Sequence, residues 1–226
     1  MRVSKIAASA VAACALAGAF AGAQAATVLS EGFTDITTLA TSVWVATNNS
    51  APVGDGWFQG NSGIFAAQAG AASSYVGVNF NATTAASGVI DTWLISPVLT
   101  LGAGASVSFY TRASDVGFLD RLDVLFNSGS SSATGSFTTV LGTVGSASTA
   151  TYPTSSWALV TYALPTAATG RIAFHYSVAD AMNASYIGID SVTVTAVPEP
   201  ATVALFGLGM AVVGTAAARR RAQRSA

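Results

Sequence analysis

The chain is poor in the side chains on which most catalytic and metal sites depend. It has one cysteine, Cys14, and one histidine, His175. A single cysteine excludes an internal disulfide, and one histidine with no cysteine in the body is too few for a zinc site of the usual kind. No G-x-S-x-G accompanies His175, so a triad with a nucleophile elbow is not supported either. His175 is out of phase with its apolar neighbours, which is typical of an ordinary strand histidine facing the outer side of a sheet.

Charge is also scarce, at 8% of residues. Residues 26–200 contain no lysine and three arginines, against all ten acidic residues of the chain, which gives this part a net charge of −7. An acidic body of this kind is not drawn to nucleic acid or to anionic lipid. Cations, including divalent ones, are the small partners that its charge favours.

The longest uncharged segment of interest lies near the C-terminus. Ala201–Ala218 has 18 residues without a charge, and as a helix it would cover roughly 27 Å, close to the ~30 Å hydrocarbon core of a bilayer. A cluster of basic residues follows it: Arg219, Arg220, Arg221 and Arg224. Such a cluster holds its end of a helix in the cytoplasm. We therefore expect a transmembrane helix over 201–218; the alternative, a buried apolar helix, fits the missing polar face and the charge cluster less well.

The N-terminus has the composition of a secretory signal peptide. Arg2 and Lys5 form a basic region, Ile6–Gly22 is apolar and rich in alanine, and Ala23 and Ala25 supply the small residues that signal peptidase reads. We expect residues 1–25 to be removed, with cleavage after Ala25 or one residue later. A lipoprotein signal ending at Cys14 is the alternative, but it would leave only a short apolar run before the cysteine.

Between the two ends, alternation of apolar and polar residues predicts a series of short strands. The alternation is clearest at Ser106–Arg112, Arg121–Phe126 and Arg171–Val178. Residues Gly, Ser and Asn separate these segments, and no helical period of useful length appears. About eight to eleven strands of this kind indicate an all-β, antiparallel β-sandwich over residues 26–196.

Two positions predict irregularities in the strands. Pro97 cannot donate to a ladder, so an edge or a break is expected there. In Tyr186–Val197 the apolar phase slips near Asp190 and Ser191. This slip predicts a β-bulge or a strand buried on both faces.

The C-terminal segment, residues 197–226, resembles a known sorting signal. Pro198, Glu199 and Pro200 precede the apolar helix and the arginine cluster, and this order is similar to that of the PEP-CTERM signal. The resemblance implies recognition by a membrane exosortase and cleavage near the triplet. It also implies an inner-membrane intermediate, followed by delivery to the cell surface or extracellular matrix.

The body resembles the choice-of-anchor J domain, in the order GWFQGNSGIF, SYVGVNF, DTWLISPVL, VSFYTR, DRLDVLF, YPTSSWALV, GRIAFHYSV and YIGIDSVTV. The order holds from Phe33 to Val194. This family is similar to cleaved-adhesin and MAM-like jelly rolls, so the resemblance implies a jelly-roll-like sandwich but no particular activity. His175 stands where the family usually has an arginine.

Two ligand sites are expected from the residues. Glu31 and Asp190 would meet if the first and last strands are neighbours, and their oxygens suit calcium, which related adhesin-type sandwiches bind. Asp190 bonded to the backbone at the bulge is the alternative. Trp57, in a loop rich in Gly, Asp and Asn, is the tryptophan we expect to be exposed for stacking on a sugar; core packing is expected of the other three.

Hydrolysis of glycosides would need two carboxylates facing one another across a sugar. Asp120 and Asp123 are three apart on a strand and so point to opposite faces, and Asp115 and Asp91 are the other candidates. We expect Asp120 to begin a strand and to pair with Arg121.

The sequence thus predicts an exported, non-enzymatic surface or matrix protein with a structural or adhesive role and one β-sandwich domain. A carbohydrate-binding module for extracellular polysaccharide is the alternative, and a glycoside hydrolase is a weaker one. Signal peptidase, exosortase and the membrane are the expected partners during export, and nucleic acid is not expected as a partner.

Overall fold

The computed structural model describes residues 25–167 and 169–196. Residues 1–24 of the expected signal peptide, the expected membrane helix 201–218, the Pro198–Pro200 triplet and the arginine cluster lie outside these residues. Among the residues described, no helix is both long and apolar enough to cross a membrane.

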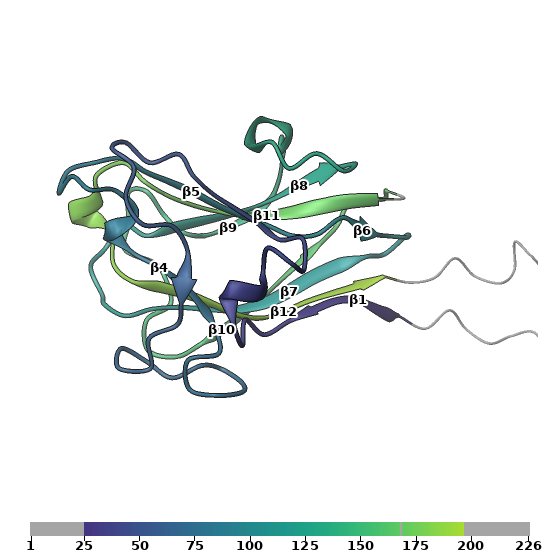
Figure 1. Ribbon diagram of the computed structural model, residues 1–226, viewed down its shortest axis with the longest axis horizontal. Coiled ribbons are helices and arrows are strands. Elements are labelled where there is room, and N and C mark those ends of the chain that lie inside the picture. Colours follow the sequence, from purple (N-terminus) through teal and green to yellow (C-terminus); the bar gives the residue numbers. More distant parts are fainter. Residues whose placement is uncertain (1–24, 168, 197–226) are drawn as a thin grey trace, which may run out of the picture. The chain divides into compact units, whose positions relative to one another are not determined.

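The described chain forms two antiparallel sheets that face one another as layers (Figure 1). The first sheet has the strand order β10 (Ala158–Ala163), β7 (Ser106–Ala113), β12 (Ile187–Ala196), β4 (Val76–Val78) and β3 (Phe58–Gln59), with β1 (Ala26–Glu31) also paired to β12. The second has the order β2 (Val45–Asn48), β5 (Ile90–Ile95), β11 (Thr169–Val178), β8 (Arg121–Ser128) and β9 (Thr139–Gly145), with β6 (Leu99–Thr100) paired to β11. The predicted all-β antiparallel sandwich is confirmed.

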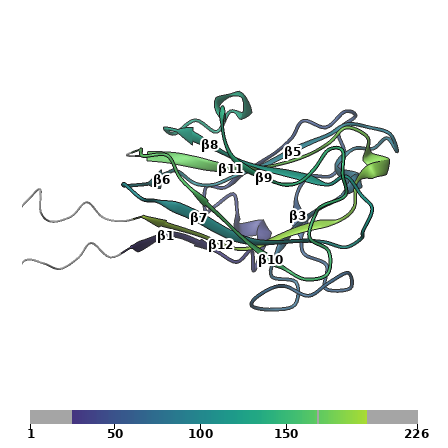
Figure 2. The same cartoon turned by 180° about the vertical axis from the view of Figure 1, so that it is seen from behind.

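Four single turns of 3-10 helix interrupt the loops: η1 (Ile36–Thr38), η2 (Phe80–Ala82), η3 (Thr134–Ser136) and η4 (Ala181–Asn183). Figure 1 shows η2 and η4 at its left-hand end, whereas β1 begins and β12 ends at its right-hand end. Seen from behind in Figure 2, the same two ends and the same two layers are visible.

The core lies between the sheets because each strand turns one set of alternating side chains inward. In β7, Val107, Phe109 and Thr111 are buried, as the alternation of Ser106–Arg112 predicts. Phe109 meets Phe174 of β11 edge to face, with ring centroids 5.0 Å apart. Contacts of this kind between strands of the two sheets hold the layers together.

The outer face of the second sheet carries His175. Ile172, Phe174 and Tyr176 belong to the core, whereas His175 stacks on Trp93 with centroids 3.9 Å apart and contacts Asp91 Oδ1 at 2.8 Å. The expectation that His175 faces the other side of the sheet is confirmed. Burial lowers the pKa of His175, with the bond to Asp91 opposing this effect.

Both predicted irregularities are present. Pro97 lies between β5 and β6, so the strand is interrupted there. The pairing of β12 with β7 shifts register between Asp190 and Thr193, and Ser191 has a φ of 52°. The β-bulge that the apolar phase indicated is therefore confirmed, and it fixes where Asp190 points.

The predicted ion pair between Asp120 and Arg121 is wrong. Strand β8 begins at Arg121, one residue after Asp120, and the Arg121 guanidinium pairs with Asp123, at 3.0 Å, and not with Asp120. Residues two apart on a strand share a face, whereas neighbours point to opposite faces. Asp120 instead points inward, as the next section describes.

Candidate functional site

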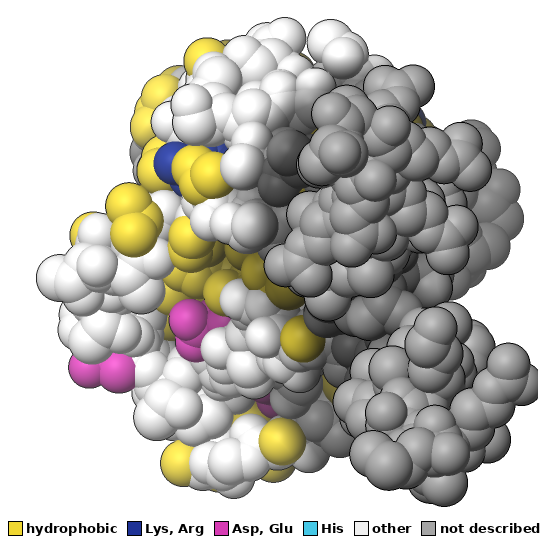
Figure 3. Space-filling view, turned by 90° about the vertical axis from the view of Figure 1, so that its right-hand side faces the viewer, with side chains coloured by type: hydrophobic (Ala, Val, Ile, Leu, Met, Phe, Trp, Pro, Cys, Tyr) yellow, Lys and Arg dark blue, Asp and Glu magenta, His cyan; other side chains and the backbone are white. Residues whose placement is uncertain are grey.

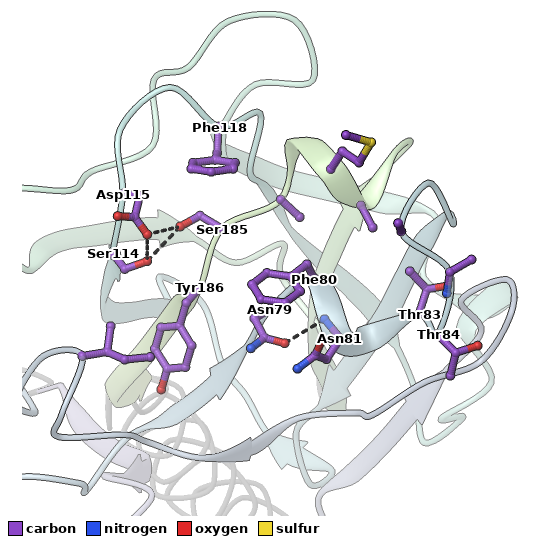
Figure 4. Close-up of a pocket in the computed structure, with 16 residues that line it drawn as sticks. Asn79, Phe80, Asn81, Thr83, Thr84, Ser114, Asp115, Phe118, Ser185 and Tyr186 are labelled. Atoms are coloured by element: carbon purple, nitrogen blue, oxygen red, sulfur yellow. Dashed lines mark hydrogen bonds between the residues drawn. The ribbon is translucent and has the colours of Figure 1, made fainter.

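Four loops meet in an open cleft at the end of the sandwich that carries η2 and η4. The loops follow β3, β4, β7 and β11. The cleft has a volume of about 760 Å³ and is lined by Ile64, Asn79, Phe80, Asn81, Thr83, Thr84, Ala85, Ala86, Ser114, Asp115, Phe118, Ala181, Met182, Ala184, Ser185 and Tyr186. Figure 4 shows its side chains arriving from both sheets.

Two capped turns place apolar side chains at the mouth of this cleft. Asn79 Oδ1 accepts a hydrogen bond from the Asn81 amide at 2.9 Å, and Asp180 Oδ1 accepts one from the Met182 amide at 3.0 Å. These side chains end the preceding strands and start η2 and η4, as Asn and Asp do at helix caps. Phe80 and Met182 are consequently turned outward and are 51% and 67% exposed.

The polar wall of the cleft is a small network of hydroxyls around Asp115. Its Oδ2 accepts hydrogen bonds from Ser114 Oγ at 2.5 Å and from Ser185 Oγ at 3.3 Å, and the two hydroxyls are 2.9 Å apart (Figure 4). Phe118, from the same loop as Asp115, is half-buried nearby. An exposed carboxylate and an aromatic ring thus stand on one side of the cleft.

Asp120 supports this wall from inside. Its Oδ1 accepts hydrogen bonds from the Tyr176 hydroxyl at 2.6 Å and from the Ser185 amide at 2.9 Å. Oδ2 is buried without a partner among the described residues. Burial raises the pKa of Asp120 and the nearby charge of Asp115 adds to this, while its two hydrogen bonds oppose it. Asp120 therefore anchors Ser185 and does not face a ligand.

The cleft brings together side chains of several chemical kinds. Its lining combines exposed apolar surface with amides and hydroxyls, and Asp115 is the one carboxylate among the described residues that form it. Glycoside hydrolysis needs a second carboxylate across the substrate. Asp120 is buried, Asp123 is paired with Arg121, and Asp91 contacts His175 on the outer face of the second sheet.

The expected exposure of Trp57 is wrong. The residue is 9% exposed and belongs to the main core cluster. The loop around it is pressed onto the β4–β5 connection, since the Gly54 and Asp55 amides donate to the carbonyls of Ala82 and Asn81 at 3.0 and 2.7 Å. The turn residues of this loop thus serve close packing, and the ring turns inward.

Burial of the other tryptophans is confirmed for two and partial for the third. Trp44 is 4% exposed in the main core, and Trp93 is 9% exposed in a smaller cluster on the outer face of the second sheet, whereas Trp157 is half-buried against an aromatic cluster. The exposed ring that sequence reasoning missed is Phe80, which the alternation of Ser74–Phe80 places on the same face as Val76 and Val78. The signal against this was Asn79 followed two residues later by Asn81, a cap that ends the strand.

Glu31 and Asp190 lie on neighbouring strands, since β1 pairs with β12 and Glu31 stands opposite Val192. Each carboxylate already binds backbone amides. Glu31 Oε1 accepts from Phe33 N at 2.7 Å, and Asp190 Oδ2 accepts from the amides of Gln68 and Ala69 at 2.8 and 3.1 Å. Burial raises the pKa of Asp190, and these hydrogen bonds oppose the rise. Asp190 thus ties the long β3–β4 loop to the bulge in β12.

Comparison with known proteins gives matches for the C-terminal segment and for the sandwich. Residues 196–221 match the PEP-CTERM protein-sorting motif. This motif implies an exported protein that is sorted to the cell surface and processed by an exosortase. No curated protein is similar enough to count as a relative.

The sandwich is similar to solved cleaved adhesin domains of Lys-gingipain from Porphyromonas gingivalis. The K3 domain is 24% identical with a TM-score of 0.54, and the match covers 76% of this chain and 99% of that one. The K1 domain is 23% identical with a TM-score of 0.56 over the same shares. These neighbours are non-catalytic adhesin domains. The chain therefore has the β-sandwich fold of these domains, and more particularly it carries a PEP-CTERM sorting motif at its C-terminus.

Proposed function

We propose that this exported protein has an adhesive role at the cell surface or in the extracellular matrix, and that the loop-end cleft binds extracellular polysaccharide. The observation that carries the proposal is the outward turn of Phe80 and Met182 beside the amides of Asn79 and Asn81. Exposed rings give sugars an apolar face to stack on, and neighbouring amides and hydroxyls satisfy their hydroxyl groups.

The size and place of the cleft support this role. Its volume of about 760 Å³ falls in the range of small-molecule sites and suits a short stretch of a glycan chain. The turns η2 and η4, which border the cleft, lie at the opposite end of the sandwich from the end of β12 at Ala196 (Figure 1). The C-terminal sorting segment therefore leaves the sandwich at the end away from the cleft.

A structural role without a specific ligand is the second candidate. Figure 3 shows the end of the sandwich where β1 begins, and most of the described atoms there are uncharged polar side chains or backbone, with few charged groups. A surface of this kind repels neither neighbouring proteins nor neutral polymers. It favours dense packing in a matrix, independently of the cleft.

Glycan-array binding of the full-length chain in detergent, followed by titration of the best glycan, tests the proposal. Replacing Phe80 by Ala should weaken binding about 2- to 10-fold, the usual worth of one stacking contact. Leu159→Ala is the matched control because Leu159 is 59% exposed on β10 and does not line the cleft. Equal loss in both variants, or no binding by the wild type, would favour the structural candidate.

Calcium binding by Glu31 and Asp190 is a separate proposal. It is supported by the pairing of β1 with β12 and by the family resemblance. Calcium would have to bind carboxylate oxygens of Glu31 and Asp190 that also accept hydrogen bonds from backbone amides. The test is thermal unfolding with added calcium and with a chelator. A rise in Tm with calcium that is lost in Glu31→Gln supports it, and an unchanged Tm contradicts it.

A further inference from the structure

Asp115 is the one charged side chain that lines the cleft within the described residues. It is exposed, and both of its hydroxyl partners, Ser114 and Ser185, donate to Oδ2. Its other oxygen, Oδ1, thus remains available to a donor from a ligand. Figure 4 shows the carboxylate at the same side of the cleft as the ring of Phe118.

No arginine of the body neutralises this carboxylate, because all three are held by other groups. Arg112 donates to the Thr154 carbonyl and lies over the Phe65 ring, Arg121 pairs with Asp123, and Arg171 donates to the carbonyls of Ser96 and Ser130. Residues 26–200 have no lysine, and their net charge is −7. Asp115 therefore gives the cleft a negative charge that no arginine neutralises, and cations are favoured there.

We propose that the cleft selects glycans that carry free amino groups over glycans that carry carboxylates, and that Asp115 is the residue that determines this specificity. The inference rests on the proposed function, in which the cleft binds polysaccharide. A protonated amino group donates to Oδ1 in a charge-assisted hydrogen bond and gains further from the faces of Phe80 and Phe118 if it lies within about 6 Å of them. A uronic acid brings a second negative charge to the same place.

A basic peptide would satisfy the same carboxylate, but the rest of the lining favours a sugar. Asn79 and Asn81 flank Phe80, so polar donors and acceptors stand at the edge of an exposed ring (Figure 4). A pyranose presents an apolar face and a polar rim, and it uses both. A lysine side chain would place its alkyl stem beside these amides and leave their hydrogen bonds unmade.

The test compares three hexasaccharides with different charges on the full-length chain in detergent. The probes are hexamers of glucosamine, of N-acetylglucosamine and of galacturonic acid, titrated at a pH where the amino groups are protonated. We expect the wild type to bind the glucosamine hexamer tightest and the galacturonate hexamer weakest. Asp115→Asn should weaken the glucosamine complex about 2- to 5-fold, the usual worth of one exposed ion pair, and leave the N-acetylated complex unchanged.

Asp35→Asn provides the matched control. Asp35 is exposed and caps η1, and Asn caps helices equally well, so this variant removes one charge far along the chain from the cleft residues. Its affinity for all three hexamers should equal that of the wild type. Added salt should weaken only the glucosamine complex, since screening reduces the attraction between exposed charges.

The outcomes separate the inference from the function on which it rests. Binding of the hexamers with no preference by charge, or with a preference for galacturonate, overturns the inference and leaves the proposed function standing. Binding of an oligolysine peptide in the absence of glycan binding overturns both. A loss on Asp115→Asn that is equal for charged and neutral hexamers shows a structural role for Asp115 and also overturns the inference.

Discussion

Tyr176, near the C-terminal end of β11, donates a 2.6 Å hydrogen bond to the buried carboxylate of Asp120, and the same oxygen accepts a hydrogen bond from the amide of Ser185 in the cleft wall. One buried acid thus links a strand of the second sheet to the loop that enters β12 in the first. The cleft depends on this link for the position of Ser185, and through Ser185 for the hydroxyl that reaches Asp115.

The buried acid makes stability depend on pH in a defined direction. Burial raises the pKa of Asp120 above its ordinary value of 3.8, so the folded protein holds this proton more tightly than the unfolded chain does. Its contribution to stability is therefore complete below that ordinary value and is lost as the pH rises through the raised pKa. We expect Asp120→Asn, which cannot lose a proton, to show a smaller fall in unfolding free energy with rising pH.

Urea unfolding at a series of pH values checks this prediction through the difference between variant and wild type. Asp190, whose pKa burial also raises, and His175, whose pKa burial lowers, contribute equally to both proteins and cancel in the difference. Asp55→Asn, at an exposed carboxylate, is the control. Parallel pH profiles for Asp120→Asn and the wild type would contradict the prediction.

Asp190 should contribute more to the free energy of unfolding than a surface carboxylate does. Asp190→Ala leaves the amides of Gln68 and Ala69 without their acceptor, and a hydrogen bond to a charged group contributes about 1.5–3 kcal/mol. Asp190→Asn keeps one acceptor oxygen and should lose less. Urea unfolding gives the free energies, and amide exchange should report opening of the β3–β4 loop specifically. Equal stability of the Ala variant and the wild type would show that the loop does not depend on this carboxylate.

The sequence predicted the strands whose two faces differ and missed the places where loops from distant strands combine. Val107, Phe109 and Thr111 alternate with polar residues because one face of β7 is buried, and this period is visible locally. The slip at Asp190 and Ser191 was visible for the same reason. Trp57 was assigned the opposite exposure, since its environment depends on how the β2–β3 loop lies on η2, and this contact has no local signal.

Gly60 should not tolerate a side chain. A Cβ at this position would overlap the ring of Tyr75, whose hydroxyl bonds to the backbone of Asn61 and Phe65. Overpacking of a buried site of this kind costs about 1–3 kcal/mol. Gly32→Ala is the matched control, because a Cβ there meets nothing within 4 Å. Thermal unfolding should therefore show a clear loss of Tm for Gly60→Ala and little change for Gly32→Ala.

Sorting is expected to remove both ends of the chain. The PEP-CTERM motif at 196–221 implies exosortase processing, and residues 1–25 have the pattern of a signal peptide. Intact mass of the protein from the surface or matrix fraction should therefore correspond to a chain that begins at Ala26 or one residue later and ends near the Pro198–Pro200 triplet. Full-length chain recovered from that fraction would contradict this expectation.

Substitutions in the triplet and in the arginine cluster should interrupt sorting at different steps. Replacing Glu199 by Ala removes the acidic residue of the triplet but leaves the apolar segment intact, so the chain should accumulate in the membrane fraction with its tail still attached. Replacing Arg219, Arg220, Arg221 and Arg224 by Gln removes the charge that holds the tail in the cytoplasm, and the uncut chain should pass the membrane or lose its orientation. Protease accessibility of a tag placed after Ala226 distinguishes the two results. Thr202→Ala, two residues after the triplet, is the control. A Glu199 variant cut as efficiently as this control would show that the exosortase does not recognise the triplet.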